Sequence, residues 1–236
     1  MNLNISTRLE TIAGIVTCHN SVADIGTDHG YIPIYLAKKG ISDRIIALDV
    51  NEGPLKKAEE NIKLYSVQDK VSTRLSNGFE NLLPGETDTV IIAGMGALLI
   101  NSILKEGLNK AHSAKELILC PHCDVERTRL FLYENNFAIR DEFMVKEDGK
   151  YYFILKADTG RMEKPEDEYL YYGRPLLERC DMTLLEYLKK ELALCRIIKE
   201  NILTNGNGDN TRLMEICHKE ECIQRGLSMY EIRRNS

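Results

Sequence analysis

Short apolar runs alternate with amphipathic stretches through the first two thirds of the chain. The runs are rich in β-branched residues and bounded by turn residues, which is the pattern of strands buried on both faces of a parallel sheet. The stretches between them carry apolar residues three and four positions apart, which predicts helices. The predicted strands are residues 22–25, 44–49, 70–75, 88–93 and 116–120, and the predicted helices are residues 5–16, 34–39, 53–64, 98–104 and 125–136.

The pattern changes after the fifth strand and its helix. Two extended runs, residues 137–146 and 150–157, are joined by the turn Glu147-Asp148-Gly149 and predict a hairpin. The alternation before them predicts a parallel sheet with crossover helices on both faces. Residues 70–75 alternate between apolar and polar and are expected nearer the sheet edge. The sequence therefore predicts an α/β fold of seven strands, the last of them antiparallel.

The composition changes again after residue 158. Residues 161–168 are charged and contain a proline, which is typical of a linker. Apolar residues at helical spacing then predict two helices, residues 184–202 and one from residue 211, separated by the glycine- and asparagine-rich residues 205–210. We expect an antiparallel, coiled-coil-like helical hairpin. The predicted domains are residues 1–159 and 160–236.

Length, composition, cysteine count and net charge limit the classes of protein to which the chain can belong. A chain of 236 residues, 43% hydrophobic, can form one sizeable core with an appendage. No apolar run approaches the roughly 20 residues needed to cross a bilayer, and the first six residues lack the pattern of a secretion signal. The seven cysteines are an odd number, which favours a reducing cytoplasm over a disulfide framework. The net charge of −5 does not indicate a nucleic-acid-binding protein, although a chain with an acidic net charge can still carry a basic face.

The turn after the first strand carries the main candidate chemistry. Asp24, Gly26, Asp28 and Gly30 stand at every second position between a strand and a helix. This arrangement presents free backbone N–H groups to a ligand at a helix N-terminus. The spacing resembles the E/D-x-G-x-G-x-G signature of S-adenosylmethionine-dependent methyltransferases of the Rossmann-like class I fold, with Asp28 in place of the middle glycine. The predicted seven-stranded sheet agrees with that class, whereas a dehydrogenase-type domain does not end in a hairpin.

Polar residues also follow the second and third strands. Asp49 and Val50 end the second strand, at the place where an acid accepts ribose hydroxyls in dinucleotide-type sites. Asn77, Gly78 and Phe79 follow the third strand, where an amide could reach an adenine amino group and a ring could cover the base. Ordinary turns would explain both segments. Their common position at strand ends favours a ligand site.

The fourth strand ends in Ala93-Gly94-Met95-Gly96. Two glycines there let the backbone approach cofactor and acceptor closely, whereas a turn that serves packing alone would need only one. We expect this segment to lie beside the transferred group.

The fifth strand ends in Cys120-Pro121-His122-Cys123, which permits two other interpretations. A C-x-x-C at the start of a helix is typical of thioredoxin-type oxidoreductases, but no later proline precedes a strand as that site requires. As a zinc half-site the motif would need further ligands, for which Cys217, His218 and Cys222 are the candidates. The match in spacing is poor, and no metal is expected.

Three segments together resemble the bacterial TrmK family: residues 23–33, 92–96 and 119–121. Residues 6–9 and 147–150 fit the same family. Its members are tRNA (adenine22-N1)-methyltransferases with a Rossmann-like catalytic domain and a C-terminal coiled-coil-like domain. The resemblance implies S-adenosyl-L-methionine as cofactor and tRNA as partner. One departure concerns contacts to the acceptor base, because the family usually has Gln and Asn around the proline where this chain has Cys120 and His122.

The resemblance also implies roles for individual residues. N1 of an adenine in the D-arm region of tRNA would attack the sulfonium methyl group in line, with Asp28 orienting the exocyclic amino group. The expected catalytic residues are Asp28, Gly94, Met95 and Gly96. The expected cofactor-binding residues are Asp24, Gly26, Thr27, Asp28, His29, Gly30, Asp49, Val50, Asn77, Gly78, Phe79 and Ala93. The expected substrate-binding residues are Arg8, Tyr31, Pro121 and His122.

Two alternatives stay open from the sequence. The same fold could methylate a small molecule or a protein, with the helical hairpin as a lid or dimer contact. The chain could also be a non-catalytic cofactor-binding module whose helices recruit a partner. A cytoplasmic location is expected, and a monomer is favoured although the sequence leaves the oligomeric state open.

Overall fold

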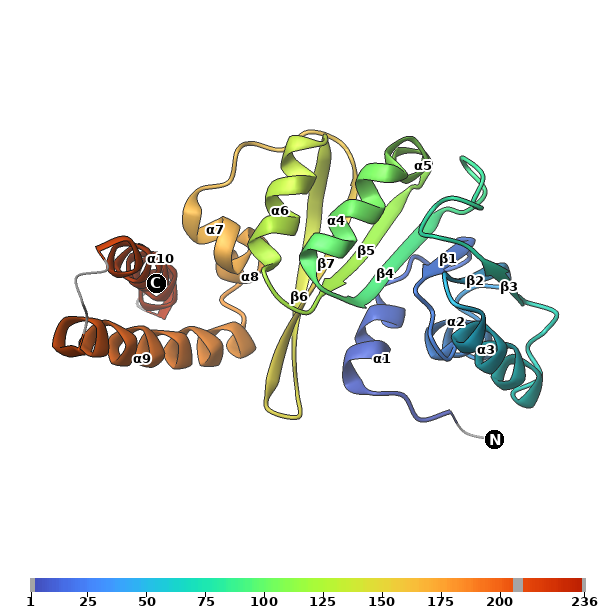
Figure 1. Cartoon of the computed structure of the whole chain (residues 1–236), viewed down its shortest axis with the longest axis horizontal. Coiled ribbons are helices and arrows are strands. Elements are labelled where there is room, and N and C mark those ends of the chain that lie inside the picture. The colour runs from blue at the N-terminus through green and yellow to red at the C-terminus, as the bar shows by residue number, and fades with distance from the viewer. Residues whose placement is uncertain (1–2, 206–209, 235–236) are drawn as a thin grey trace. The chain divides into compact units, whose positions relative to one another are not determined.

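The computed structural model describes residues 3–205 and 210–234. The chain forms two compact units, Met1–Glu163 and Lys164–Ser236 (Figure 1). No helix in the described residues is long and apolar enough to span a membrane. All seven cysteines are free thiols. The cytoplasmic location expected from cysteine usage stays a prediction.

One seven-stranded sheet runs through the first unit, in the order β3-β2-β1-β4-β5-β7-β6. Strands β1 to β5 pair in parallel, and β7 is antiparallel to both β5 and β6. The predicted fold class is therefore confirmed, including the antiparallel last strand. The strands are β1 (Val22–Ile25), β2 (Ile45–Asp49), β3 (Val71–Leu75), β4 (Thr89–Met95), β5 (Glu116–Pro121), β6 (Phe137–Glu147) and β7 (Lys150–Thr159).

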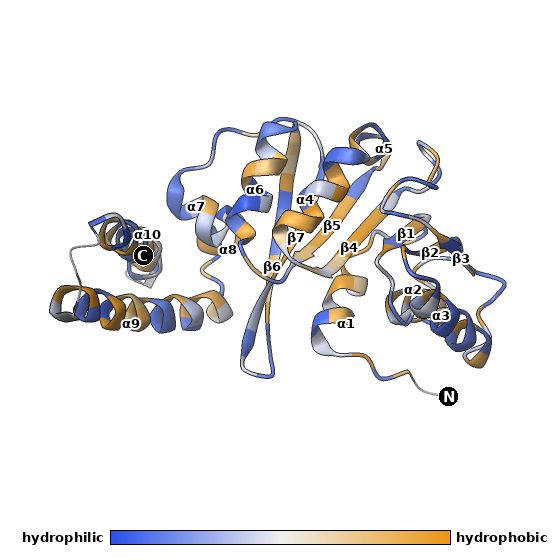
Figure 2. Cartoon of the chain, viewed as in Figure 1, coloured by the Kyte–Doolittle hydropathy of each residue, from blue (hydrophilic) through white to orange (hydrophobic). Residues whose placement is uncertain are grey.

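The burial of each strand follows from its sequence. All residues of β1 and β5 are buried, as expected for apolar central strands covered on both faces. Figure 2 shows the same hydrophobic character along β4 and β5. In β3 most side chains are partly or fully exposed, and this strand forms one edge of the sheet, as its alternation predicts. The β6–β7 turn places Asp148 and Gly149 at positive φ, which a tight hairpin requires.

Helices cover both faces of the sheet. Helices α1 to α3 pack on one face and α4 to α6 on the other. Ser6 caps α1, because its hydroxyl accepts the Leu9 N–H at 3.4 Å. The helices are α1 (Thr7–Gly14), α2 (Tyr31–Lys38), α3 (Glu52–Leu64), α4 (Ala97–Glu106), α5 (Leu108–Ser113) and α6 (Val125–Glu134).

Two features of the α4–α6 face were not predicted from the sequence. Leu98 and Leu99 do not belong to the buried side of α4, since they are 65% and 53% exposed. The helix instead turns Ile100, Ile103 and Leu104 into the core. Helix α5 was not predicted, because six residues are too few for helical periodicity to show.

The second unit is entirely helical in the residues that the structure describes: α7 (Asp167–Tyr172), α8 (Arg174–Glu178), α9 (Met182–Asn205) and α10 (Asn210–Arg234). Asp167 and Glu168 belong to α7, so the expectation of a linker over residues 161–168 is wrong at its end. The predicted glycine–asparagine break falls mostly on residues 206–209, outside the described residues.

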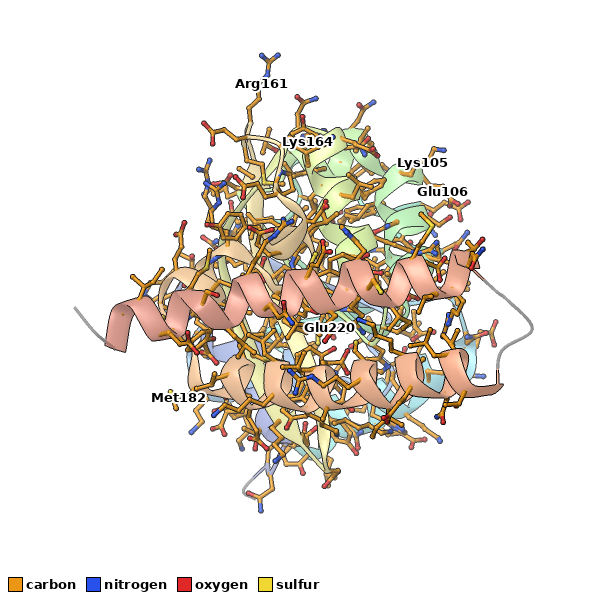
Figure 3. All side chains as sticks on the ribbon, turned by 90° about the vertical axis from the view of Figure 1, so that its left-hand side faces the viewer. Lys105, Glu106, Arg161, Lys164, Met182 and Glu220 are labelled. Carbon is orange, nitrogen blue, oxygen red and sulfur yellow. The ribbon has the colours of Figure 1, made fainter. Side chains whose placement is uncertain are left out.

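Helices α9 and α10 lie side by side (Figure 3). Leu184, Leu188 and Cys195 on α9 are buried, as are Ile216 and Ile223 on α10. The same apolar positions carry the sequence pattern, so the prediction of a helical hairpin is confirmed. Ion pairs add to the contact, for example Lys199 on α9 with Glu220 on α10 at 2.9 Å.

A fully buried ion pair joins α6 to β6. The Arg129 guanidinium contacts both carboxylate oxygens of Glu142, at 3.1 and 2.8 Å, and its central carbon lies 4.9 Å from the centre of the Phe153 ring. Buried charges are tolerated only when they are paired in this way, since breaking one pair leaves a charge in a low dielectric.

Replacing Glu142 with Gln therefore tests how the first unit holds this charge. Glu142→Gln keeps the shape of the side chain but removes the charge opposite Arg129. We expect the free energy of unfolding to fall by about 3 kcal/mol or more, measured by urea denaturation.

The matched control is Asp158→Asn, the same chemical change in a partly exposed pair with Arg140 on the same hairpin. Its side chains are 32% and 56% exposed, so we expect a loss below about 1 kcal/mol. Equal losses in the two variants would contradict the account.

Candidate active site

A cavity of about 370 Å³ opens at the carboxyl ends of β1 and β4. Parallel α/β sheets bind ligands at this edge. The wall comes from α1, the β1–α2 turn, the end of β4 and the loop after β5. The lining residues are Arg8, Leu9, Asp24, Gly26, Thr27, Asp28, His29, Tyr31, Ile32, Ala93, Gly94, Met95 and His122. Most residues that the sequence assigns to a site are thus brought together.

The β1–α2 turn depends on backbone conformations that few side chains allow. Gly26, Asp28 and Gly30 have φ values of 78°, 51° and 73°. Asp is one of the few non-glycine residues that tolerates the left-handed region, which explains how Asp28 can replace the middle glycine of the motif. A Cβ on Gly26 would lie 2.0 Å from the end of the Met95 side chain. The turn therefore lets a side chain, or a ligand, approach its backbone closely.

Asp24 lies next to the last residue of β1, with its side chain buried at the cavity wall. The Thr27 hydroxyl donates to its Oδ2 at 2.7 Å. Burial raises the pKa of Asp24 from 3.8 to about 7; the hydrogen bond from Thr27 opposes this shift, and the charge of Asp49 adds to it. A cation in the cavity would favour the charged form of this carboxyl group.

Asp49, at the end of β2, fastens the turn to the next strand. Its Oδ2 accepts the Asp28 N–H at 3.3 Å, and its Oδ1 accepts the Asn51 N–H at 2.9 Å. The β1–β2 pairing places Ile25 beside Leu48, so Asp49 comes next to the glycine turn. Asp49 does not line the cavity itself, and Val50 beside it is exposed.

Asn77, Gly78 and Phe79 do not line this cavity. They line a separate hollow of about 340 Å³, together with Gly107 and other residues of α4 and α5. Phe79 is buried, and its ring lies so close to Gly107 that a Cβ there would be 2.3 Å away. The adenine contacts expected from these three residues stay a prediction.

The opposite wall combines α1 with the β6–β7 hairpin. The backbone N–H of Arg8 donates to the Glu147 carboxylate at 3.2 Å. The Arg8 guanidinium lies 5.0 Å from the centre of the Tyr152 ring. The Nε and Nη1 atoms of Arg8 are buried without an oxygen or nitrogen acceptor in the protein; the Glu147 carboxylate lies 3.9 Å from Nε, and the Arg8 side chain interacts with the Cys120 thiol. Buried donors of this kind call for a ligand or water. No sequence pattern pointed to Tyr152, because its contact with Arg8 joins segments far apart in the chain.

His122 completes this wall. Its backbone N–H donates to the Met95 carbonyl at 2.9 Å. Its ring meets the Tyr152 ring edge-on, with the ring centres 5.7 Å apart. Burial, together with the charges of Arg8 and Lys150, lowers the pKa of His122. Its imidazole is therefore neutral at pH 7 and can donate or accept a hydrogen bond. Pro121 pairs with Met95 in the sheet and does not line the cavity.

The two cysteines of the C-x-x-C motif lack the properties of a redox pair. Cys120 is buried in β5, and burial raises the pKa of its thiol to about 11. A hydrogen bond and the charge of Asp124 raise the pKa of Cys123 as well. Reactive C-x-x-C motifs have a lowered pKa instead. Among the described residues, no third metal-ligating side chain joins this pair.

The cavity is therefore bounded by carboxylates on one side and by Arg8 with a neutral imidazole on the other. Asp24 and Asp28 suit a ligand with a positive group. The buried donors of Arg8 suit an acceptor atom or a phosphate. Among the described residues that line the cavity, none is a cysteine, serine or lysine that could act as an activated nucleophile.

Comparison with known proteins agrees with this arrangement. Residues 5–155 match the family model of a methyltransferase domain. The tRNA (adenine(22)-N(1))-methyltransferase of Bacillus subtilis (strain 168) is 34% identical over 165 residues, which are 70% of this chain and 69% of that protein.

Solved structures give the same result over nearly the whole length. The crystal structure of the B. subtilis m1A22 tRNA methyltransferase TrmK has a TM-score of 0.86 at 29% identity, covering 95% of this chain and 99% of that one. A Streptococcus pneumoniae protein solved in complex with S-adenosyl-L-methionine has a TM-score of 0.85 at 30% identity, covering 95% and 100%.

Replacing Asp24 with Asn tests the buried carboxyl group in the unliganded protein. The folded-state pKa is raised from 3.8 to about 7, so the folded chain holds a proton that the unfolded chain releases. The contribution of Asp24 to stability is therefore greatest below pH 3.8 and is lost as the pH rises to about 7. Asp24→Asn should lack this loss and exceed the parent by on the order of a few kcal/mol above pH 7 in urea denaturation.

The control has the opposite sign. Lys115, with Ser21, lowers the pKa of Asp88 from 3.8 to about 2. Asp88→Asn should therefore be less stable than the parent at neutral pH and converge with it as the pH falls towards 2. Parallel pH profiles for Asp24→Asn and the parent would refute the assigned burial of a proton at Asp24.

Proposed function

Because the chain belongs to the TrmK family of bacterial methyltransferases, we propose that it methylates N1 of adenine 22 in tRNA. The methyl donor is S-adenosyl-L-methionine. The observation that carries the proposal is the cavity at the β1 and β4 ends, which joins the glycine turn to Gly94 and Met95 in one wall. The curated relative with that activity aligns over two thirds of both chains.

The residues of the β1–α2 turn fit the proposed cofactor. S-adenosyl-L-methionine carries a sulfonium and an ammonium group, and Asp24 and Asp28 are the carboxylates that line the cavity. The absence of a Cβ at Gly26 lets the backbone of the turn approach this ligand closely. Asp49 and the exposed Val50 are assigned to the ribose and adenine, with Asn77, Gly78 and Phe79 beyond them.

Gly94, Met95 and Gly96 are assigned to the acceptor side. Gly94 has a φ of 82°, and no atom lies within 4 Å of the place where its Cβ would be. A flat base can therefore approach the backbone there. The bound cofactor supplies an electrophilic methyl group, so the protein's own part is to hold N1 in line with it and to exclude water.

Side chains around this space are assigned to hold the base. N1 of adenine has a lone pair, so no proton has to be removed before attack. Asp28 would accept a hydrogen bond from the exocyclic amino group, and neutral His122 would contact the other edge. Tyr31, which is half-exposed beside His29, would stack on the base, and the buried donors of Arg8 would bind a phosphate.

Recognition of the whole tRNA is a separate requirement. An adenine in folded tRNA must leave its stack to reach a methyl group in this cavity. We assign the recognition of tRNA shape and phosphates to the helical hairpin together with basic residues near the cavity. The two alternatives, another methyl acceptor or a non-catalytic binding module, make different predictions in the same assay.

The direct test is methyl transfer from labelled S-adenosyl-L-methionine to a tRNA transcript with adenine at position 22. We expect label in 1-methyladenosine at that position and none in a transcript with guanine there. Cofactor binding without transfer would favour the binding module. Transfer to a co-purified protein or small molecule, but not to tRNA, would favour another acceptor.

Asp49→Ala tests the assignment of the cofactor. Hydrogen bonds to a charged group contribute about 1.5–3 kcal/mol, so losing the ribose acceptor should weaken cofactor affinity at least about tenfold. Isothermal titration calorimetry measures the dissociation constant.

The control for that variant is Glu60→Ala, which removes an exposed acid from α3 and should leave the affinity unchanged. Near-normal affinity of Asp49→Ala would show that its ribose role is wrong. Urea denaturation of both variants separates lost binding from lost stability.

A further inference from the structure

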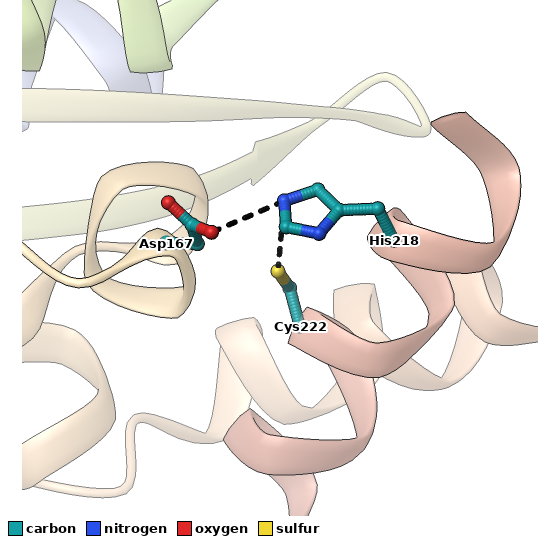
Figure 4. Close-up of side chains that lie close together, drawn as sticks. All are labelled: Asp167, His218 and Cys222. Carbon is teal, nitrogen blue, oxygen red and sulfur yellow. Dashed lines mark hydrogen bonds and ion pairs between the residues drawn. The ribbon is translucent and has the colours of Figure 1, made fainter. Parts of the chain in front are cut away.

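Three side chains of the helical unit converge on one point. Asp167 begins α7, while His218 and Cys222 lie one turn apart on α10 (Figure 4). The His218 Nε2 atom lies 3.3 Å from Asp167 Oδ2 and 3.8 Å from Cys222 Sγ. All three atoms lie within 4.8 Å of one another. One ring nitrogen thus faces a carboxylate and a thiol together.

These distances match the edges of a tetrahedral zinc site. With Zn–N and Zn–O distances of about 2.1 Å and a Zn–S distance of about 2.3 Å, tetrahedral angles separate N from O by about 3.4 Å and N from S by about 3.6 Å. Small side-chain adjustments would bring the three atoms into contact with one ion.

Hydrogen bonding alone leaves the cluster poorly satisfied. The Nε2 atom either carries a proton, which it can donate to Asp167, or has a lone pair, which can accept from the Cys222 thiol. It cannot do both, so either the Nε2 lone pair faces the Asp167 carboxylate or the Cys222 thiol loses Nε2 as an acceptor. A cation between the three atoms would satisfy all of them.

The surroundings are asymmetric. Cys222 is completely buried, whereas the side chains of Asp167 and His218 are 53% and 43% exposed. Solvent therefore reaches one side of the cluster, where an ion could enter and a water molecule could take a fourth position. Three protein ligands with a water in the fourth position is the zinc coordination found in enzymes.

Contacts next to the cluster hold the two helices in place. Arg225 on α10 pairs with buried Glu168 on α7 at 3.2 Å. The Tyr171 ring meets the His218 ring edge-on at 6.2 Å. Because residues four apart lie on the same face of a helix, His218 and Cys222 both point to α7. The three donors are thus preorganised.

We propose that Asp167, His218 and Cys222 bind a zinc ion that fastens α7 to α10. The mixture of sulfur, nitrogen and oxygen donors suits Zn²⁺ and not Mg²⁺ or Ca²⁺, which prefer oxygen ligands. Binding converts the Cys222 thiol to the thiolate and releases its proton to solvent. Because the ion binds only the folded helices, it stabilises the helical unit. The inference is independent of methyl transfer.

The test uses the full chain, freed of metal with a chelator and titrated with Co²⁺ as a spectroscopic substitute for Zn²⁺. We expect one Co²⁺ per chain, with visible bands of tetrahedral coordination and a sulfur-to-cobalt charge-transfer band that Zn²⁺ removes. Zinc should also raise the midpoint of thermal unfolding. Cys222→Ser should lose the charge-transfer band, while Cys217→Ser, a change at a cysteine next to His218, should keep it.

Asp167→Asn keeps the proposal testable if changes at the buried Cys222 disturb folding, because Asp167 lies on the exposed side. Partners outside a metal's own ligands are already worth about 10–100-fold in affinity, so losing this carboxylate should weaken zinc binding at least about tenfold. Glu166→Gln is the matched control, because it neutralises the exposed acid just before Asp167 and should leave zinc affinity unaltered.

Three results would overturn the proposal. The first is no charge-transfer band in the parent chain. The second is a band that survives Cys222→Ser but is lost in Cys123→Ser, which would place the metal at the C-x-x-C motif. The third is zinc affinity that Asp167→Asn leaves unchanged.

Discussion

The left-handed turn between β1 and α2 is the constraint on which the rest of the site depends. Three of its residues, Gly26, Asp28 and Gly30, adopt positive φ within five positions. Gly30 packs against Ala58 of α3, and Gly26 lies under the end of Met95. The turn thereby places Asp24 and Asp28 in the wall of the cavity. A larger residue at either glycine would disturb the link between the sheet and the candidate active site.

The charges and buried polar groups around the cavity are better suited to binding a ligand than to packing. Burial makes ionised Asp24 unfavourable in the unliganded protein, so its pKa rises to about 7. A cationic ligand would reverse that shift, which makes the carboxyl group a better partner for a ligand than for the folded chain alone. On the opposite wall, buried donors of Arg8 have no oxygen or nitrogen acceptor in the protein. The buried carboxyl group of Asp24 and the buried donors of Arg8 are both unfavourable for packing, and both are explained if a ligand binds in the cavity.

Local patterns predicted the elements well and long-range contacts poorly. Apolar runs located β1 to β5, and the turn at Asp148 and Gly149 located the hairpin. Helices α5, α7 and α8 were missed because five or six residues carry too little periodicity. The exposed Leu98 and Leu99 show that an apolar residue in a helix need not face the core.

The same contrast between local patterns and long-range contacts holds for the residues of the candidate active site. Residues on one strand end or turn, such as Asp24 and Gly94, could be assigned from spacing. The contact of Arg8 with Tyr152 and the cluster of Asp167 with His218 and Cys222 join distant segments, so no local pattern contains them. Phe79 lines a separate hollow and packs against Gly107, a contact that no local pattern contains, so its expected place at the cofactor stays a prediction.

The most direct measurement is a crystal structure of the chain with S-adenosylhomocysteine. The account predicts the ligand along the carboxyl ends of β1, β2 and β4, with its ribose hydroxyls on Asp49 and its sulfur facing Gly94. A ligand bound elsewhere, or a cavity that stays empty at saturating concentration, would contradict the account.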